Sequence, residues 1–85
     1  SDDSITLGDG TFTNVTGTNT ILYITPKSPG HEYTLQFDGA LTVTDNGAGG
    51  NLDIGADFST GATDVLKIVM NSAGTRWLQV SRSDN

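Results

Sequence analysis

Short runs in which apolar and polar residues alternate recur along the chain, and Gly, Asn or Asp closes most of them. The clearest run spans residues 32–37, where Tyr33, Leu35 and Phe37 fall on one face and polar residues on the other. A period of two is typical of a β-strand with one buried face. No apolar run has the length and 3.6-residue period of a helix. The pattern therefore predicts an all-β chain.

Further strands are expected at residues 5–7, 11–15, 21–24, 41–44, 51–54, 64–70 and 76–81. Asp38-Gly39 is a turn signal, so residues 32–37 and 41–44 are predicted to form a hairpin. Residues 26–30 are expected to form a loop because neither proline there can donate to a ladder. Short strands spaced about ten residues apart predict one domain over residues 1–85, a small antiparallel β-sandwich or jelly-roll-like fold.

Two of these strands, 21–24 and 64–70, carry apolar residues on both faces. In a two-layer domain one face of such a strand fills the core, and the other face is exposed to solvent unless a neighbouring subunit covers it. Leu66, Ile68 and Met70 are expected in the core. Lys67 interrupts the opposite face, so Val65 and Val69 are predicted to lie at a subunit boundary.

A small domain of this composition needs additional stabilisation. Only 34% of the residues are hydrophobic, and the chain has no cysteine for a disulfide. The sequence shows no metal-ligand cluster either, so we expect no cofactor and no metal. Oligomerisation remains as the expected source of stability.

The charge balance excludes several classes of partner. The formal net charge is −6, with 10 acids against 4 scattered bases, which is unsuited to nucleic acid or anionic lipid. No apolar run is long enough to span a bilayer and no signal peptide is recognisable, so no membrane insertion is expected. The chain lacks an initiator methionine and is expected to be a fragment of a longer protein.

Little in the chain could perform catalysis. Four of the nine aspartates directly adjoin Gly or Asn, and the aspartates are expected mainly to complete turns or to lie at the surface; a weak calcium site near Asp45 or Asp53 is the alternative. His31, alone in a loop, is expected to be solvated rather than to act as an acid, base or metal ligand. No nucleophile elbow, phosphate-binding loop or nucleotide fingerprint is present. We expect no enzymatic activity, and an autonomous small enzyme is the least favoured interpretation.

Aromatic residues are the remaining candidates for contacts. Phe12, Phe37 and Phe58 are expected in the core. Tyr23, Tyr33 and Trp77 combine an apolar body with a polar group and, if exposed, could stack on sugar rings. Together with His31 they form the candidate carbohydrate-binding set, with core or interface packing as the alternative. The 13 threonines are expected on solvent faces, because T-x-T pairs are too sparse for an ordered hydroxyl array.

Several segments together resemble a known family. They are Ile5-Thr6-Leu7, Phe12, Asn14 to Thr18, Ile21 and Ile24, Gly30, Tyr33 to Val43, Asn51-Leu52, Asp64-Val65-Leu66, and the ending Trp77-Leu78-Gln79-Val80-Ser81-Arg82-Ser83. In this order they resemble the small C-terminal β domain that follows the pectate-lyase-like β-helix in many bacteriophage tailspikes and tail fibres. The resemblance spans nearly the whole chain, and its strongest part is the Trp77 to Ser83 ending.

This resemblance implies a homotrimeric module of a virion tail, located outside the host cell, that aids trimer assembly and host-surface attachment through bacterial polysaccharide. The catalytic carboxylates of such spikes lie in the preceding β-helix, so no catalytic position maps onto this chain. The alternative is a carbohydrate-binding module of a secreted or virion-borne polysaccharide-degrading enzyme. Oligomeric mass distinguishes the two, because a typical sugar-binding module is a monomer with an exposed aromatic platform.

Overall fold

The computed structural model describes residues 4–7 and 10–83, and over these residues the chain forms strands and no helix. The strands are β1 (Ser4–Ile5), β2 (Phe12–Val15), β3 (Tyr23–Ile24), β4 (Glu32–Phe37), β5 (Thr42–Val43), β6 (Leu52–Asp53), β7 (Phe58–Ser59), β8 (Val65–Met70) and β9 (Trp77–Ser83). The expected all-β class is confirmed.

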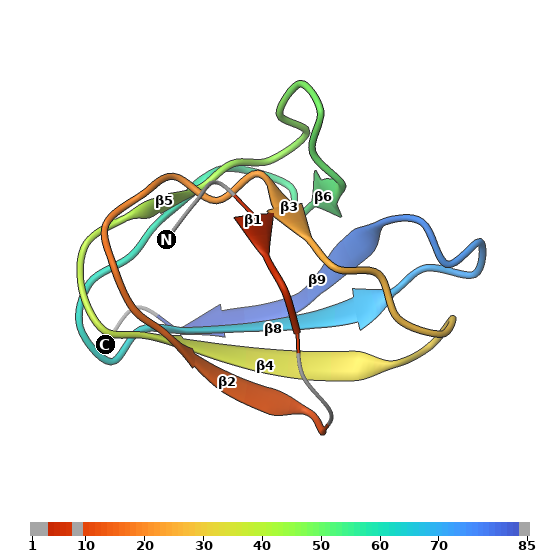
Figure 1. Ribbon diagram of the computed structural model, residues 1–85, viewed down its shortest axis with the longest axis horizontal. Helices are drawn as coiled ribbons and strands as arrows, with labels where there is room; N and C mark the ends of the chain where they lie inside the picture. Colours follow the sequence, from red (N-terminus) through yellow and green to blue (C-terminus); the bar gives the residue numbers. More distant parts are fainter. Residues whose placement is uncertain (1–3, 8–9, 84–85) are drawn as a thin grey trace.

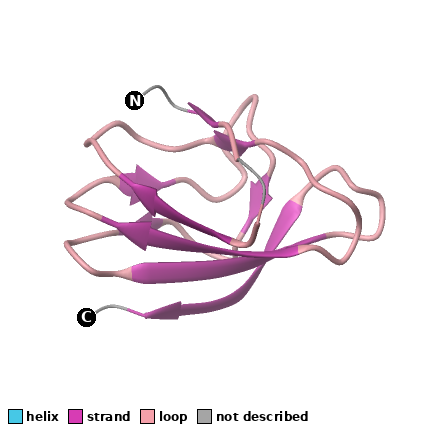
Figure 2. Ribbon diagram, turned by 60° about the horizontal axis from the view of Figure 1, so that its bottom comes forward, coloured by secondary structure: helices cyan, strands magenta, loops and turns pink. Residues whose placement is uncertain are grey.

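The strands form one main sheet covered on a single face. The main sheet has five strands in the order β2-β4-β8-β9-β6. Figure 1 shows β2, β4, β8 and β9 in the lower layer, with β1, β3 and β5 above them. The covering layer holds two short ladders, β1–β3 and β5–β7, and an isolated bridge between Ile21 and Val43. Figure 2, in which the bottom of Figure 1 is turned forward, shows the long strands side by side.

The expectation of an antiparallel fold is wrong for part of the molecule. The pairs β4–β8, β8–β9 and β5–β7 are antiparallel, but β1–β3, β2–β4 and β6–β9 are parallel, so the sheets are mixed. A parallel pair needs a long connection, and the chain between β2 and β4 supplies it by passing through the covering layer.

The predicted hairpin between residues 32–37 and 41–44 is also wrong. β4 pairs with β2 and β8, whereas β5 pairs with β7 in the other layer, matching Val43 with Phe58. After Asp38-Gly39 the chain crosses the core instead of folding back beside β4. Leu41 and Val43 thereby join the core cluster that also contains the inward side chains of β4. Alternation identified both strands correctly but carried no information on which strand each would pair with.

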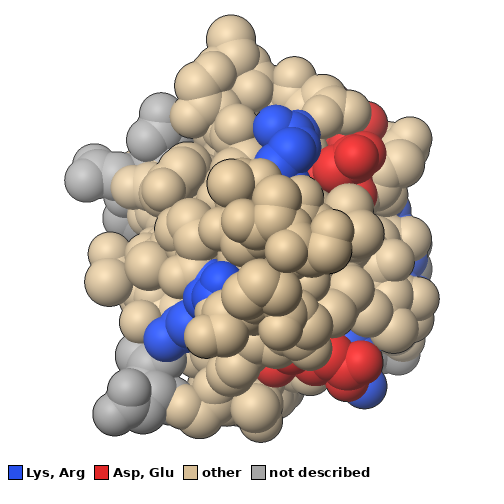
Figure 3. Space-filling model, turned by 90° about the vertical axis from the view of Figure 1, so that its right-hand side faces the viewer, with Lys and Arg blue, Asp and Glu red and all other residues tan. Residues whose placement is uncertain are grey.

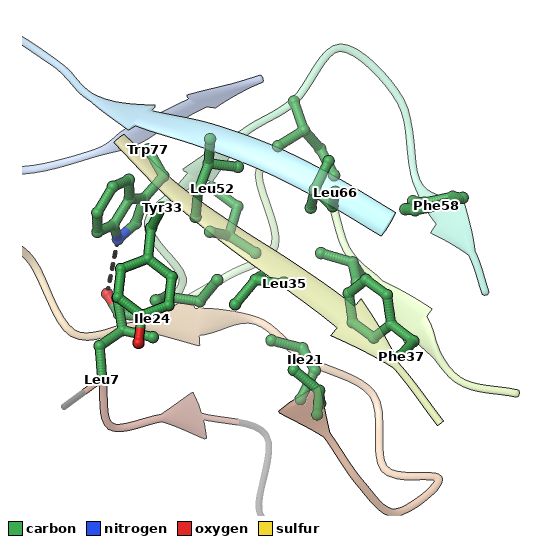
Figure 4. Close-up of a cluster of buried hydrophobic side chains, with 14 of the residues drawn as sticks. Leu7, Ile21, Ile24, Tyr33, Leu35, Phe37, Leu52, Phe58, Leu66 and Trp77 are labelled. Atoms are coloured by element: carbon green, nitrogen blue, oxygen red, sulfur yellow. Dashed lines mark hydrogen bonds between the residues drawn. The ribbon is translucent and has the colours of Figure 1, made fainter. Parts of the chain in front are cut away.

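The core lies between the main sheet and its covering layer (Figure 4). Its main-sheet side follows the predicted alternation: Leu66, Ile68 and Met70 from β8 are 0–2% exposed, as expected. Tyr33, Leu35 and Phe37 from β4 are equally buried. The covering layer contributes buried residues such as Ile21, Ile24 and Val43.

Buried polar side chains tie the two layers together. Asn51 is 4% exposed, and its amide bonds both backbone groups of Ile24: Oδ1 accepts the N–H at 3.0 Å and Nδ2 donates to the carbonyl at 2.7 Å. Trp77 Nε1 donates to the same carbonyl at 3.2 Å (dashed line in Figure 4). The Asn51 side chain thus takes the place of a neighbouring strand on this side of Ile24, because buried backbone groups must be paired.

Aspartates hold the connecting loops, as the sequence predicted. Asp45 Oδ1 accepts the backbone N–H groups of Ile54 and Gly55 at 2.8 and 3.2 Å. Asp64, 1% exposed, accepts the N–H of Gly61 at 2.8 Å. Asp64 closes the turn that begins at Gly61, in agreement with the expected turn role, whereas Asp45 joins two loop segments that lie farther apart in the sequence.

Candidate interaction surface

The uncovered side of β2, β4, β8 and β9, called the outer sheet face below, is the most distinctive surface of the described residues. Strand alternation dictates which side chains it carries: those between the buried positions of each strand. Cross-strand register then sets them in rows. One row runs from Glu32 through Val69 to Leu78, and another from Phe12 through Thr34 to Lys67.

Apolar and polar side chains are mixed on this face. The exposed large hydrophobic residues of the described chain are Phe12 at 55%, Val80 at 47%, Leu78 at 38% and Tyr23 at 38%. Phe12 and Leu78 occupy outward positions of the main sheet, and Val80 follows in β9. Val65 and Val69, the two predicted interface residues, are half-buried on the same face. With two of the four exposed hydrophobic residues and both half-buried valines, the outer sheet face is the candidate interaction surface of the described residues.

Phe12 corrects a prediction. The sequence analysis placed it in the core, yet it is the most exposed of these residues. The alternation of its own strand explains why: Val15 is buried, so Thr13 shares its inward face while Phe12 and Asn14 point outward. That period-two pattern was available in the sequence, but the aromatic identity of Phe12 favoured burial.

The last strand, β9, is irregular at Val80. The β8–β9 register shifts between Lys67 and Ile68, so that Lys67 faces Ser81 while Ile68 faces Gln79. The extra residue between these two partners is Val80. A bulge of this kind breaks the alternation that the sequence predicted for the last strand.

The outer sheet face is almost neutral. Lys67 and Glu32 form an ion pair with 3.3 Å between Nζ and Oε1. They are the only charged residues at outward positions of β2, β4 and β8. Their charges cancel, although the whole chain has a formal charge of −6. Figure 3 shows an adjoining side of the molecule, where basic and acidic groups lie next to each other within otherwise uncharged surface.

The structure does not bring the four carbohydrate-binding candidates together at the surface. Trp77 and Tyr33 are 0% and 1% exposed, so neither ring can stack on a sugar in this structure. For both residues the alternative of core packing is correct. Trp77 bonds Ile24 as described, and the Tyr33 hydroxyl donates to the carbonyl of Phe12 at 3.3 Å.

The other two candidates are accessible to different degrees. Tyr23, on β3 of the covering layer, is 38% exposed. His31 is half-buried before β4, with its ring centroid 6.1 Å from that of Tyr33, and its Nε2 is enclosed without a hydrogen-bond partner. The expectation of a freely solvated histidine is therefore wrong. Tyr23 is the one aromatic candidate that remains available to a ligand.

The described residues form no pocket and no group of three or more His, Asp or Glu side chains placed to hold a metal ion. They also contain no long apolar helix that could cross a membrane. The surface of this part of the chain thus offers faces and edges for contact rather than a cleft.

Comparison of the chain with family models, with curated proteins and with solved structures finds no match. The tailspike resemblance therefore rests on the residues quoted for it, and it enters below as a proposal.

The exposure of Tyr23 predicts that glycan binding to the isolated domain is weak. Titration with oligosaccharides from bacterial surface polysaccharides should give NMR shifts only at millimolar ligand and only around Tyr23 and the His31 loop. Tyr23→Ala should abolish the shifts, and reducing-end assays should detect no cleavage. Submicromolar binding, shifts centred on the outer sheet face, or turnover above buffer controls would contradict this expectation.

Proposed function

We propose that this chain is a non-catalytic assembly and attachment module, which forms a homotrimer through its outer sheet face. In the context given by the tailspike resemblance, it is the C-terminal trimerisation and host-surface attachment module of a bacteriophage tailspike, acting in the virion tail outside the cell. The observation that carries the proposal is the combination of exposed apolar side chains and near-zero charge on one face of the main sheet.

Charge favours another copy of the same chain as the occupant of this face. Two chains with a net charge of −6 repel each other over most of their surfaces. On the outer sheet face the Lys67–Glu32 pair cancels, so copies can approach there with the least like-charge repulsion. Such electrostatic matching selects an orientation of approach. Val65 and Val69 lie on either side of Lys67 on the same face of β8, where they offer apolar surface to a neighbouring copy.

A closed trimer would use a modest share of the surface of each chain. A stable interface buries roughly 800 Å² per partner, about a fifth of the 4251 Å² surface of this chain. Three copies placed about a threefold axis would each direct the outer sheet face inward, so one surface serves both neighbours and the assembly closes. The covering layers then face outward.

This arrangement also explains how a weak ligand site could serve in attachment. Tyr23 lies in the covering layer, which is turned away from the outer sheet face. A trimer would display three such sites on its outside. Simultaneous engagement raises the overall affinity by orders of magnitude without new contacts at any single site.

Val69→Asp tests the assembly. We expect the wild-type domain to sediment with the mass of three chains at micromolar concentration and to show a melting temperature that rises with concentration. A carboxylate at position 69 would be buried without a partner in the interface, so the variant should lose the trimer and melt at lower temperature. The readouts are sedimentation equilibrium and thermal unfolding followed by circular dichroism.

Ala73→Asp is the matched control, because it adds the same charge in an exposed turn outside the main sheet. It should retain the wild-type mass. A wild-type domain that is a stable folded monomer would defeat the proposed trimer. Glycan binding by such a monomer would instead favour the carbohydrate-binding module.

A further inference from the structure

The two edges of the main sheet differ in how they are protected. β2 lies at one edge, and at the other edge the long strand β9 is paired with the two-residue strand β6. β6 matches Leu52 with Trp77 and Asp53 with Leu78 and then ends, so the rest of β9 has no strand on that side within the described residues. Unpaired edges invite pairing with another chain, and stable proteins block them.

The segment that follows β6 continues from this edge and is not paired with β9. This segment, Ile54 to Asp57, is called the strap below. Arg82 of β9 holds it: Nη2 donates to the carbonyls of Ile54 and Ala56 at 3.2 and 2.8 Å, and Nη1 to that of Asp57 at 3.2 Å. The guanidinium carbon also lies 4.7 Å from the centroid of the Phe58 ring.

Further hydrogen bonds hold the Arg82 guanidinium and the backbone N–H groups of the strap. Arg82 Nε donates to Gln79 Oε1 at 2.6 Å, which orients the guanidinium along its own strand. Asp45 Oδ1 accepts the backbone N–H groups of Ile54 and Gly55 in the strap. In return, Asp57 Oδ1 of the strap accepts the backbone N–H of Asp45 at 2.8 Å. Three strap carbonyls are thus satisfied by one side chain rather than by strand pairing.

The edge formed by β2 has none of these protections. The parallel register directs the backbone groups of Thr13 and Val15 toward β4, so those of Phe12 and Asn14 point away from the sheet. The carbonyl of Phe12 accepts the Tyr33 hydroxyl, while no described hydrogen bond satisfies the amides of Phe12 and Asn14. β2 contains no charge, no proline and no bulge.

This asymmetry has a consequence for assembly. Pairing of the β2 edge with the β9 edge of another copy would be head-to-tail, and head-to-tail contacts that do not close grow into open fibres. The neutral β2 edge of a second copy is a suitable occupant for the β9 edge, because no like charges oppose it. We propose that the strap and Arg82 form a block that closes the β9 edge and prevents head-to-tail sheet extension between copies of this chain.

Arg82→Ala tests the block because it removes all three strap bonds at once. Hydrogen exchange at the amides of residues 79–83 should accelerate by at least about tenfold, as expected for local opening. Sedimentation velocity should show species larger than the wild-type assembly that grow with concentration, and thioflavin fluorescence should rise. Arg82→Lys, which keeps the charge but cannot reach three carbonyls, should give a smaller effect in the same direction.

Asn14→Pro in the Arg82→Ala background tests which edge is the partner. Proline removes the outward amide of β2 and should restore the wild-type mass. If Arg82→Ala fails to fold, Asp45→Ala releases the strap from its other side and leaves β9 intact. Release of the strap without larger species, or larger species that persist in the Asn14→Pro variant, would overturn the proposal.

Discussion

Trp77→Ala is expected to unfold the domain or to leave it on the verge of unfolding. Trp77 is fully buried at the centre of the core and joins the last strand to the covering layer. Truncating a buried tryptophan to alanine costs about 3–5 kcal/mol. A domain of this size has a total stability of roughly 4–13 kcal/mol, so the substitution removes a large part of it. Urea unfolding followed by far-UV circular dichroism, at one fixed protein concentration, measures the change.

Trp77→Phe separates packing from hydrogen bonding. Phenylalanine retains most of the apolar contact but loses the Nε1 donor, and the Ile24 carbonyl still accepts the Asn51 amide. The expected loss is therefore only about 1–2 kcal/mol. A Trp77→Ala variant as stable as Trp77→Phe would show that the indole is not the centre of the core.

Asn51→Leu should destabilise the domain by about 3 kcal/mol even though leucine is apolar and similar in size. The substitution leaves the buried N–H of Ile24 without an acceptor, and each buried polar group left unpaired costs about 1–3 kcal/mol. It also removes the 2.7 Å bond to the Ile24 carbonyl. Chemical unfolding of purified variants is the measurement, and hydrogen exchange at the Ile24 amide should accelerate.

Asn19→Leu is the matched control, because it makes the same chemical change at an exposed loop position. Its effect should stay within about 0.5 kcal/mol, as for most surface substitutions. Equal effects at positions 19 and 51 would mean that the Asn51 bridge contributes nothing to stability.

Local pattern predicted the strands that carry the core. Alternation within residues 32–37 matched β4, and alternation within 64–70 placed Leu66, Ile68 and Met70 inward as observed. These positions were predictable because each strand has one buried face, and the burial of one face imposes a period of two. The half-buried position of Val65 and Val69 followed from the same rule.

Pairing and surface chemistry were not predictable from local pattern. The parallel partnership of β2 with β4 depends on the path of the intervening chain through the covering layer, which no period encodes. No contact was predicted for the two arginines of the last segment, yet Arg76 donates to the Leu52 carbonyl at 3.1 Å and Arg82 holds the strap. Such long-range bonds from a side chain to the backbone leave no signature in the sequence around either partner.

The bond between Trp77 and Ile24 joins residues 53 positions apart, and this separation bears on how the protein is made. On the ribosome, the chain up to β8 lacks the indole, β9 and both arginines, so its core cannot close. Contacts between distant residues also slow folding, because long loops must close first. We therefore expect the domain to fold only after the segment through Ser83 has been synthesised. A prematurely terminated polypeptide would remain unfolded and open to proteolysis, so folding of this domain reports that translation has passed its final strand.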